Sequence, residues 1–296
     1  MRRHLDAARA TGTVSRVIAD RGIEGPVVLL RSGMNLVFRV GDVVVRVAPE
    51  HVDGQAHVEL AQRLLESGLP VVRPLDDAVV VEGFVVTLWE HIDQPAHASI
   101  DYQQLGAAIA RLHRFDVGQL PPRLPLPWCG EADWLQLESV YARAVATSVL
   151  GRDDLAVLAR ECAALADWQQ QARAEPTVIC HGDVHPQNVL MRPNGEVAIL
   201  DWDSLCLGPA AWDHAPLLTW ENRWGGQAGT YEAFADGYGT DLRESPVAQL
   251  LARVRLLAPT LNKIVQGATD AERAAEARRR MRYWRGDLNA PPWRPH

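Results

Sequence analysis

Residues 181–188 read HGDVHPQN, and this stretch decides between two kinds of protein. His181 and His185 have the spacing of zinc ligands that share one face of a helix. Gly182 weakens such a helix, Pro186 would break it, and the apolar runs on both sides have the composition of strands. The two histidines are therefore expected on a turn, and a histidine-based metal site remains an alternative.

The other interpretation centres on the aspartate between the histidines. Asp183 and Asn188 form an H-x-D-x-x-x-x-N pattern, and Asp201 follows 13 residues after Asn188 at the end of the strand-like run EVAILD. This is an arrangement used for phosphoryl transfer, in which an acceptor hydroxyl is oriented while magnesium neutralises the triphosphate. Asp183 would serve the hydroxyl, and Asn188 and Asp201 would hold magnesium through oxygen atoms. Spacing alone leaves open whether the ends of the two strands meet.

Composition narrows the class of protein further. The chain of 296 residues is 47% hydrophobic and 23% charged, which is enough for a sizeable core and two lobes. Its net charge of -7 argues against nucleic acid as a partner. No run of 18 apolar residues and no signal peptide is found, and four scattered cysteines suggest free thiols. A cytoplasmic protein with no membrane partner is expected.

The chain changes character near residue 90. Before it, β-branched runs cut by turn residues predict three antiparallel strands over 26–49, a helix over 55–70 and a hairpin over 78–92. After it, apolar residues recur at helical spacing. Helices are expected over 101–115, 133–149, 153–172 and much of 208–284, interrupted by strands at 177–180, 188–193 and 196–203. This order indicates an α+β protein with a strand-rich lobe followed by a helical one.

Three segments together carry a resemblance to a known family. HGDVHPQN, then ILDWD (199–203) and LGPAAWDHAPL (207–217), resemble the aminoglycoside phosphotransferases, which are related to choline kinases and protein kinases. The resemblance implies a protein-kinase-like fold with two lobes. Residues 1–90 would form the nucleotide-binding lobe with one inserted helix, and residues 91–296 a larger, mainly helical lobe with the catalytic loop and acceptor pocket.

The same resemblance implies roles for the motif residues. Asp183 corresponds to the catalytic aspartate, Asn188 and Asp201 correspond to the magnesium ligands, and His181 corresponds to a structural histidine. The implied cofactors are Mg²⁺ and ATP, or GTP in its place.

The resemblance also implies nucleotide contacts in the first lobe. Gly33 lies in the turn RSGMN, which would cover the phosphates, although an ordinary hairpin turn needs a glycine equally well. Arg46 stands where the family has lysine or arginine, and Glu59 matches the glutamate that pairs with it. A surface salt bridge between Arg46 and Glu59 is the alternative. The planar guanidinium leaves the phosphate geometry open, because it differs from a lysine ammonium.

The run TLWEHI resembles the segment that connects the two lobes of kinases. Backbone groups of Glu90, His91 and Ile92 would hydrogen-bond the adenine base there. From composition alone, this run is simply the end of a strand.

Six residues near the motif are candidates for the acceptor pocket. Carboxylates beside flat aromatic faces suit an amino sugar or another cationic molecule with hydroxyl groups. The candidates are His185, Asp203, Asp213, Trp220, Glu221 and Trp224. Capping and packing of helices are alternative roles for Asp213 and the tryptophans.

The sequence thus predicts an ATP-dependent kinase that phosphorylates a hydroxyl of a small molecule. An amino sugar or aminoglycoside is the leading acceptor, with choline-like or amino-acid-derived alcohols and macrolides behind it, and a role in antibiotic resistance would follow for some of these. A pseudokinase with a regulatory or scaffolding role and a histidine-based metallohydrolase remain as alternatives. A monomer or homodimer is expected.

Overall fold

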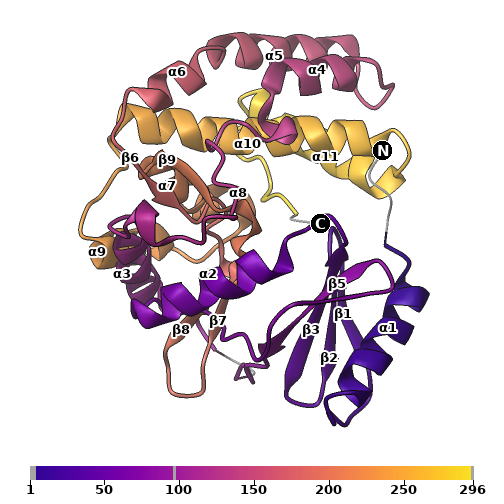
Figure 1. The fold of residues 1–296 in the computed structure, drawn as a ribbon. Coiled ribbons are helices and arrows are strands. Elements are labelled where there is room, and N and C mark those ends of the chain that lie inside the picture. Colours follow the sequence, from indigo (N-terminus) through magenta and orange to yellow (C-terminus); the bar gives the residue numbers. More distant parts are fainter. Residues whose placement is uncertain (1–4, 96–97, 295–296) are drawn as a thin grey trace. The chain divides into compact units, whose positions relative to one another are not determined.

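A five-stranded antiparallel sheet is built by the first ninety residues (Figure 1). In the computed structural model, which describes residues 5–95 and 98–294, its strand order is β1-β2-β3-β5-β4. The strands are β1 (Val28–Ser32), β2 (Leu36–Val40), β3 (Val43–Pro49), β4 (Val79–Val81) and β5 (Phe84–Glu90). The three strands predicted over 26–49 and the hairpin over 78–92 are confirmed. They form because short turns join consecutive β-branched runs.

Two helices accompany this sheet. Helix α2 (Gly54–Glu66) confirms the helix expected in this region, and Asp53 caps it by accepting a hydrogen bond from the Ala56 backbone N–H. Helix α1 (Ala7–Ala19) was not expected from the sequence. Its buried residues Val14 and Val17 belong to the same apolar cluster as strand residues of β2, β3 and β5, so tertiary packing stabilises it.

A hairpin from much later in the sequence belongs to the same compact unit as the sheet. Its strands are β7 (Val189–Met191) and β8 (Val197–Ile199). The Ile199 backbone N–H donates to the Pro70 carbonyl at 2.7 Å, and Val71 and Ile199 form a parallel bridge. The unit comprises Met1–Asp101, Phe115–Pro125 and Pro186–Trp202.

The second unit is mainly helical and comprises Tyr102–Arg114, Leu126–His185 and Asp203–His296. Its long helix α10 (Pro246–Gly267) contacts several of the others and buries an apolar face along its length. The other helices are α3 (Tyr102–Leu112), α4 (Leu137–Val145), α5 (Arg152–Ala164), α6 (Trp168–Arg173), α7 (Ala211–Leu218), α8 (Trp220–Trp224), α9 (Thr230–Tyr238) and α11 (Ala271–Trp284). Strands β6 (Thr177–Cys180) and β9 (Cys206–Pro209) pair in a two-stranded sheet.

The predicted helices are confirmed in kind, with differences at their ends. The segment 133–149 contains a 3₁₀ turn followed by α4, and the segment 153–172 is divided into α5 and α6 by a break at 165–167. Strand β9 was not expected, because its four residues have little strand character of their own. The four cysteines are free thiols, as predicted. Within residues 5–95 and 98–294, no helix combines the length and the apolar character needed to cross a membrane.

Candidate active site

The motif begins where β6 ends, and its glycine is required there. Gly182 has φ of +85°, in the left-handed region that glycine adopts readily. A Cβ at this position would lie 2.0 Å from the Ser204 carbonyl oxygen, so no other residue fits without moving the backbone. His181 is fully buried and its Nδ1 accepts a hydrogen bond from the Asp183 N–H at 3.3 Å. The turn predicted for the two histidines is confirmed.

Asp213 holds this turn in place from beneath. Its Oδ2 accepts the His181 N–H and its Oδ1 the Gly182 N–H, each at 2.8 Å, and its side chain has no exposed surface. His113 Nε2 lies 3.0 Å from Oδ2, and His113 Nδ1 lies 2.9 Å from the Tyr238 hydroxyl. Burial raises the pKa of Asp213, but the His113 contact, the nearby His181 ring and the Gly182 N–H outweigh it and hold the pKa below its usual value. Asp213 thus remains a carboxylate that anchors the loop.

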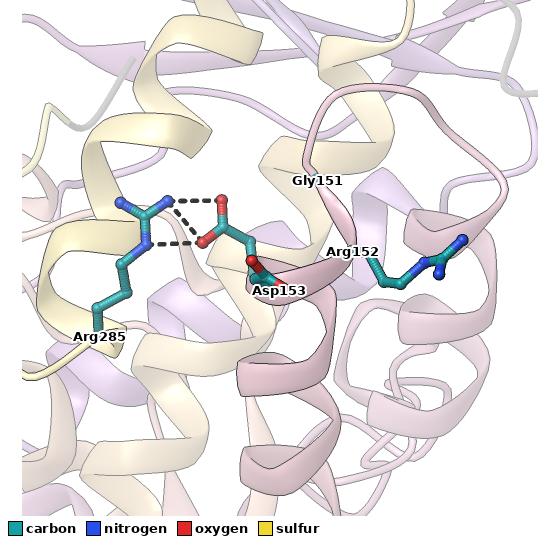
Figure 2. Close-up of a pocket in the computed structure, with 5 residues that line it drawn as sticks. Gly151, Arg152, Asp153 and Arg285 are labelled. Carbon is teal, nitrogen blue, oxygen red and sulfur yellow. Dashed lines mark hydrogen bonds and ion pairs between the residues drawn. The ribbon is translucent and has the colours of Figure 1, made fainter.

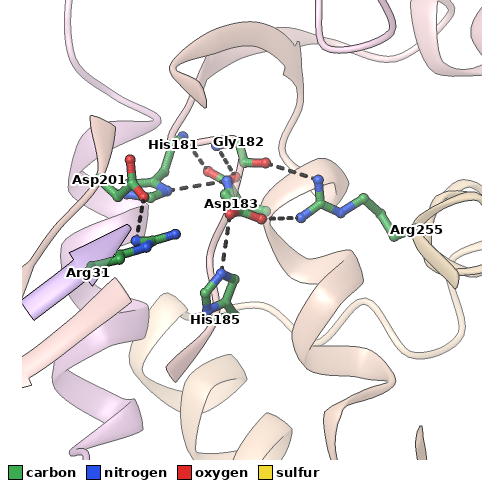
Figure 3. A network of polar contacts seen from close by, with 8 residues as sticks. Arg31, His181, Gly182, Asp183, His185, Asp201 and Arg255 are labelled. Atoms are coloured by element: carbon green, nitrogen blue, oxygen red, sulfur yellow. Dashed lines mark hydrogen bonds and ion pairs between the residues drawn. The ribbon is translucent and has the colours of Figure 1, made fainter. Parts of the chain in front are cut away.

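The Asp183 carboxylate is held by two side chains of the second unit (Figure 3). Arg255 donates from Nη2 to Oδ1 at 2.6 Å, and His185 donates from Nε2 to Oδ2 at 3.2 Å. One third of the Asp183 side chain, 33%, is exposed. Burial by itself would raise the pKa of Asp183, yet the His185 and Arg255 contacts prevail and lower it. Asp183 is therefore ionised at neutral pH and is reachable by a solute.

The hairpin of the first unit brings the two predicted magnesium ligands to one end of a ladder. Val189 pairs with Ile199, and the Leu200 N–H donates to the Asn188 carbonyl at 2.9 Å. Asn188 and Asp201 therefore flank the open end of the hairpin, opposite the Asn194-Gly195 turn. The strand ends thus meet, a point that the spacing alone left open.

Asp201 has two further features that suit a cation site. Its φ of +61° is uncommon for a residue other than glycine, and aspartate is among the few that tolerate it. Its Oδ2 lies 3.3 Å from Arg31 Nη1, so a cation already pairs with the carboxylate (Figure 3). Carboxylate and amide oxygens are the donors that Mg²⁺ prefers, and Asn188 and Asp201 supply one of each.

The predicted phosphate-binding residues lie on three different elements of the first unit. Gly33 occupies the turn between β1 and β2, where its N–H donates to the Asn35 carbonyl at 3.1 Å. Arg46 lies on β3, opposite Thr87 of β5, and is half-buried. Glu59 lies on α2 and is also half-buried. Their roles in nucleotide binding stay predictions.

The residues predicted to hold adenine lie at the end of β5. Glu90 accepts Arg192 Nη2 at 2.6 Å, and Ile92 is buried in a small apolar cluster with Val72 and Ala198. Burial of Glu90 raises its pKa, but the Arg192 hydrogen bond and the other basic contacts lower it overall. The His91 N–H donates to the Asp42 carbonyl at 3.0 Å. Glu90 therefore ties the sheet to the β7–β8 hairpin, and the adenine contacts stay predictions.

Aromatic rings lie next to His185 of the HGDVHPQN motif within the second unit. The His185 ring is nearly parallel to the Trp220 ring, with an interplanar angle of 6° and centroids 6.2 Å apart. The Trp224 ring is also stacked with the Trp220 ring, with centroids 6.0 Å apart. Glu221 Oε1 accepts the Tyr231 N–H at the start of α9, and Asp203 is exposed. Of the acceptor candidates, His185 contacts the Asp183 carboxylate, while Asp213 supports the loop from the buried side.

The second unit also contains a cluster with the spacing of a metal site and a hollow lined by charged side chains. His113, Cys180 and Asp213 are the one group in the described part of the chain with the spacing of a metal site. The His113–Asp213 hydrogen bond accounts for the proximity of two of them, and Cys180 Sγ donates to the Pro209 carbonyl at 3.5 Å. A hollow at the start of α5 is lined by acidic and basic side chains, and Arg285 pairs with both carboxylate oxygens of Asp154 there (Figure 2). That pair joins α5 to the end of α11.

Sequence reasoning missed Arg255, which contacts the catalytic candidate directly. A signal was present: Arg255 lies between Leu251 and Pro259 at helical spacing, on the face of α10 that is otherwise apolar. A charged residue on a buried face needs a partner, but the sequence does not say which one. Arg31 was missed as well, because its ion pair with Asp201 joins residues 170 positions apart.

A protein family and several solved structures are similar to this chain. The model of the phosphotransferase enzyme family (APH) matches residues 27–257. A choline/ethanolamine kinase family protein from Mesorhizobium loti superposes with a TM-score of 0.68 at 19% identity, covering 96% of this chain and 95% of that chain. No curated protein sequence matches the chain.

Two antibiotic phosphotransferases are also similar in structure. A spectinomycin phosphotransferase, solved with ADP and spectinomycin, has a TM-score of 0.68 at 14% identity and covers 93% of each chain. An aminoglycoside phosphotransferase from Streptomyces rimosus has a TM-score of 0.60 at 24% identity, covering 84% of this chain and 98% of that chain. The predicted protein-kinase-like α+β fold is confirmed. Since the family model spans most of the sequence, the chain belongs to the phosphotransferase enzyme family.

Proposed function

We propose that this protein transfers the γ-phosphoryl group of ATP to a hydroxyl group of an amino sugar, an aminoglycoside or a similar small molecule. The observation that carries the proposal is the ionised, partly exposed Asp183 carboxylate, held between Arg255 and His185 at the end of β6. Such a carboxylate can orient a hydroxyl and accept its proton as the transfer proceeds. The solved relatives that contain ADP or AMP support a nucleotide as the donor.

In this proposal the protein's residues have distinct tasks. Asp183 accepts a hydrogen bond from the acceptor hydroxyl, and the proton passes to Asp183 as the new phosphorus–oxygen bond forms and the bond to ADP breaks. Asn188 and Asp201 would hold Mg²⁺ through their side-chain oxygens, and the ion would supply positive charge to the phosphates.

The acceptor is proposed from the surroundings of Asp183. Trp220 presents a flat aromatic face next to His185, and Asp203 adds an exposed carboxylate in the same unit. Aromatic faces and carboxylates favour a cationic molecule with hydroxyl groups, which describes an amino sugar. The choline/ethanolamine kinase and spectinomycin phosphotransferase relatives are consistent with this class.

An acceptor screen tests the proposal. ADP release is measured with ATP, or with GTP in its place, in the presence of aminoglycosides, amino sugars, choline-like alcohols or macrolides. Release that depends on one acceptor, with a product one phosphoryl group heavier by mass spectrometry, is the expected result.

Asp183→Asn is the control for this screen. It should lower kcat by about 10²–10⁴-fold, because the amide cannot accept the proton, while nucleotide still binds. Nucleotide binding without ADP release for any acceptor would instead favour a regulatory protein that has lost turnover.

A further inference from the structure

We propose that Arg255 is a positioning residue for phosphoryl transfer, because it fixes the Asp183 carboxylate so that Oδ2 faces the acceptor hydroxyl. This inference rests on the proposed function and adds to it a residue outside the motif. It assigns a role to a side chain 72 positions away from Asp183, on the middle of α10.

The guanidinium holds the loop at two points. Nη2 donates to Asp183 Oδ1 at 2.6 Å, and Nη1 donates to the Gly182 carbonyl at 3.2 Å (Figure 3). One bond fixes the side chain of Asp183, and the other fixes the peptide unit that precedes it. The planar fork ties these two groups together, because its N–H donors keep a constant geometry. Rotation of the Asp183 side chain is therefore restricted relative to its own backbone.

Arg255 is itself held in place from both sides. Its Cζ lies 5.3 Å from the centre of the Trp134 ring and 5.2 Å from that of Trp212, and 9% of its side chain is exposed. Cation–π contacts of this kind stabilise a desolvated guanidinium. A side chain already immobilised in this way loses little further entropy when it binds a carboxylate. The contacts thus give Asp183 a preorganised partner.

The two carboxylate oxygens consequently differ. Oδ1 accepts the shorter bond, at 2.6 Å from the immobilised Arg255, whereas Oδ2 accepts a longer bond, at 3.2 Å from His185, whose ring stacks with Trp220. The inference assigns the acceptor hydroxyl to Oδ2, the more weakly held oxygen. As the bond between the acceptor oxygen and phosphorus forms, the bond from phosphorus to ADP breaks with its electron pair, and the hydroxyl proton passes to Oδ2. If the Asp183 side chain rotated about one of its bonds, Oδ2 would no longer lie where it can accept the hydroxyl proton.

Arg253 provides a matched control on the same helix. It pairs with Glu161 at 2.5 Å and 49% of its side chain is exposed, so it has the charge of Arg255 but binds a different carboxylate. Arg255→Gln is expected to lower kcat by about 10²-fold with the nucleotide KM within about threefold, as misplacement of a reacting group does. Arg253→Gln should stay within about twofold of the wild type for kcat.

Two further variants show whether Arg255 positions Asp183 or only stabilises the fold. Arg255→Lys keeps the charge without the fork and should recover part of kcat, about tenfold over Arg255→Gln. Because Arg255 acts through Asp183, adding Arg255→Gln to Asp183→Asn should change kcat by less than about threefold. Should Arg255→Gln fail to fold, a drop in kcat for Arg255→Lys of at least tenfold at unchanged nucleotide KM carries the test.

The inference is overturned if Arg255→Gln behaves like Arg253→Gln, if Arg255→Lys retains the wild-type kcat, or if the losses of the double mutant multiply. An active wild type with any of these results would remove Arg255 alone from the mechanism. A wild type that releases no ADP with any acceptor would overturn the proposed function first, and the role of Arg255 with it.

Discussion

At the residue scale, the surroundings of Asp183 and Asp201 fit the roles proposed for them. Asp183 is an ordinary aspartate until Arg255 and His185 lower its pKa. Its ionised form suits a group that orients a hydroxyl and takes the proton late, in a loose transition state. Asp201 has a left-handed backbone and a carboxylate that pairs with Arg31, so its environment already favours a cation.

The magnesium role of Asp201 can be tested with a substitution that preserves its backbone. Asp201→Asn removes the charge, and asparagine tolerates the left-handed region that alanine does not. Nucleotide binding should weaken by about tenfold or more when magnesium is present and change little without it, since a neutral oxygen binds Mg²⁺ less well. Titration calorimetry with and without Mg²⁺ measures both values.

A similar ion pair in the same unit serves as the control. Asp76 lies 2.8 Å from Arg21, and Asp76→Asn should leave nucleotide binding unchanged under both conditions. An equal response of the two variants would remove Asp201 from the magnesium site.

At the scale of elements, the packing of two helices supports the turn at His181 and Gly182 through a chain of contacts. Helices α3 and α9 approach closely: a Cβ on Gly106 would lie 2.0 Å from the Phe234 carbonyl, and one on Gly237 would lie 1.9 Å from the Gln103 carbonyl. This contact sets Tyr238 beside His113, whose other ring nitrogen contacts Asp213. Asp213 in turn binds the backbone of the HGD turn. The two glycines therefore bear on the site without lying in it.

Gly106→Ala tests this packing. The added methyl group should lower the free energy of unfolding by about 1–3 kcal/mol, because the helices must separate to admit it. Urea denaturation measures the loss. Gly12→Ala in α1 is the matched control, since no atom lies within 4 Å of its Cβ. That change should stabilise the protein by about 0.5–1 kcal/mol. A Gly106→Ala protein as stable as the wild type would show that the helices are not held this closely.

At the scale of the whole molecule, the motif is divided between two units of the chain. The chain leaves the second unit after His185, forms the β7–β8 hairpin in the first, and returns after Trp202. Asp183 thus belongs to the helical unit, whereas Asn188 and Asp201 belong to the unit with the five-stranded sheet. The lobe boundary predicted after residue 90 stays a prediction.

Global stability should depend on a histidine beneath the loop. Burial, together with the neighbouring His113, lowers the pKa of His214 from 6.5 to about 4. Its Nδ1 lies 3.0 Å from the Tyr231 hydroxyl, which also accepts the Leu242 N–H. Between these two pKa values the unfolded chain binds a proton that the folded chain does not. Stability is therefore lost as the pH falls from 6.5 toward 4.

His214→Phe should reduce this pH dependence. Between pH 7 and pH 5 the wild type is expected to lose about 2 kcal/mol more of its unfolding free energy than the variant does. Urea denaturation at the two pH values gives the difference. His51→Phe, at an exposed position, should keep the wild-type dependence. Identical pH profiles for His214→Phe and the wild type would contradict the assignment.

Much of the fold could be predicted because the relevant interactions are local. The strands around Gly33 and Gly41 follow from β-branched runs and tight turns, and helix α2 follows from apolar spacing and its Asp53 cap. Helix α1 and strand β9 were missed, since each depends on distant partners: α1 on the sheet, and β9 on β6. The helix breaks near 136 and 165 were missed for lack of a proline or glycine signal.

The sequence by itself determined which residues are candidates for the chemistry. Asp183, Asn188 and Asp201 were proposed from residue type and spacing, because their motif is local in the sequence, and their roles stay predictions. The tertiary structure decided how these residues are held. Only folding brings Arg255 to Asp183, Arg31 to Asp201 and Asp213 beneath the loop. These contacts join residues from 32 to 170 positions apart. Their energies depend on burial and geometry, which a linear pattern does not contain.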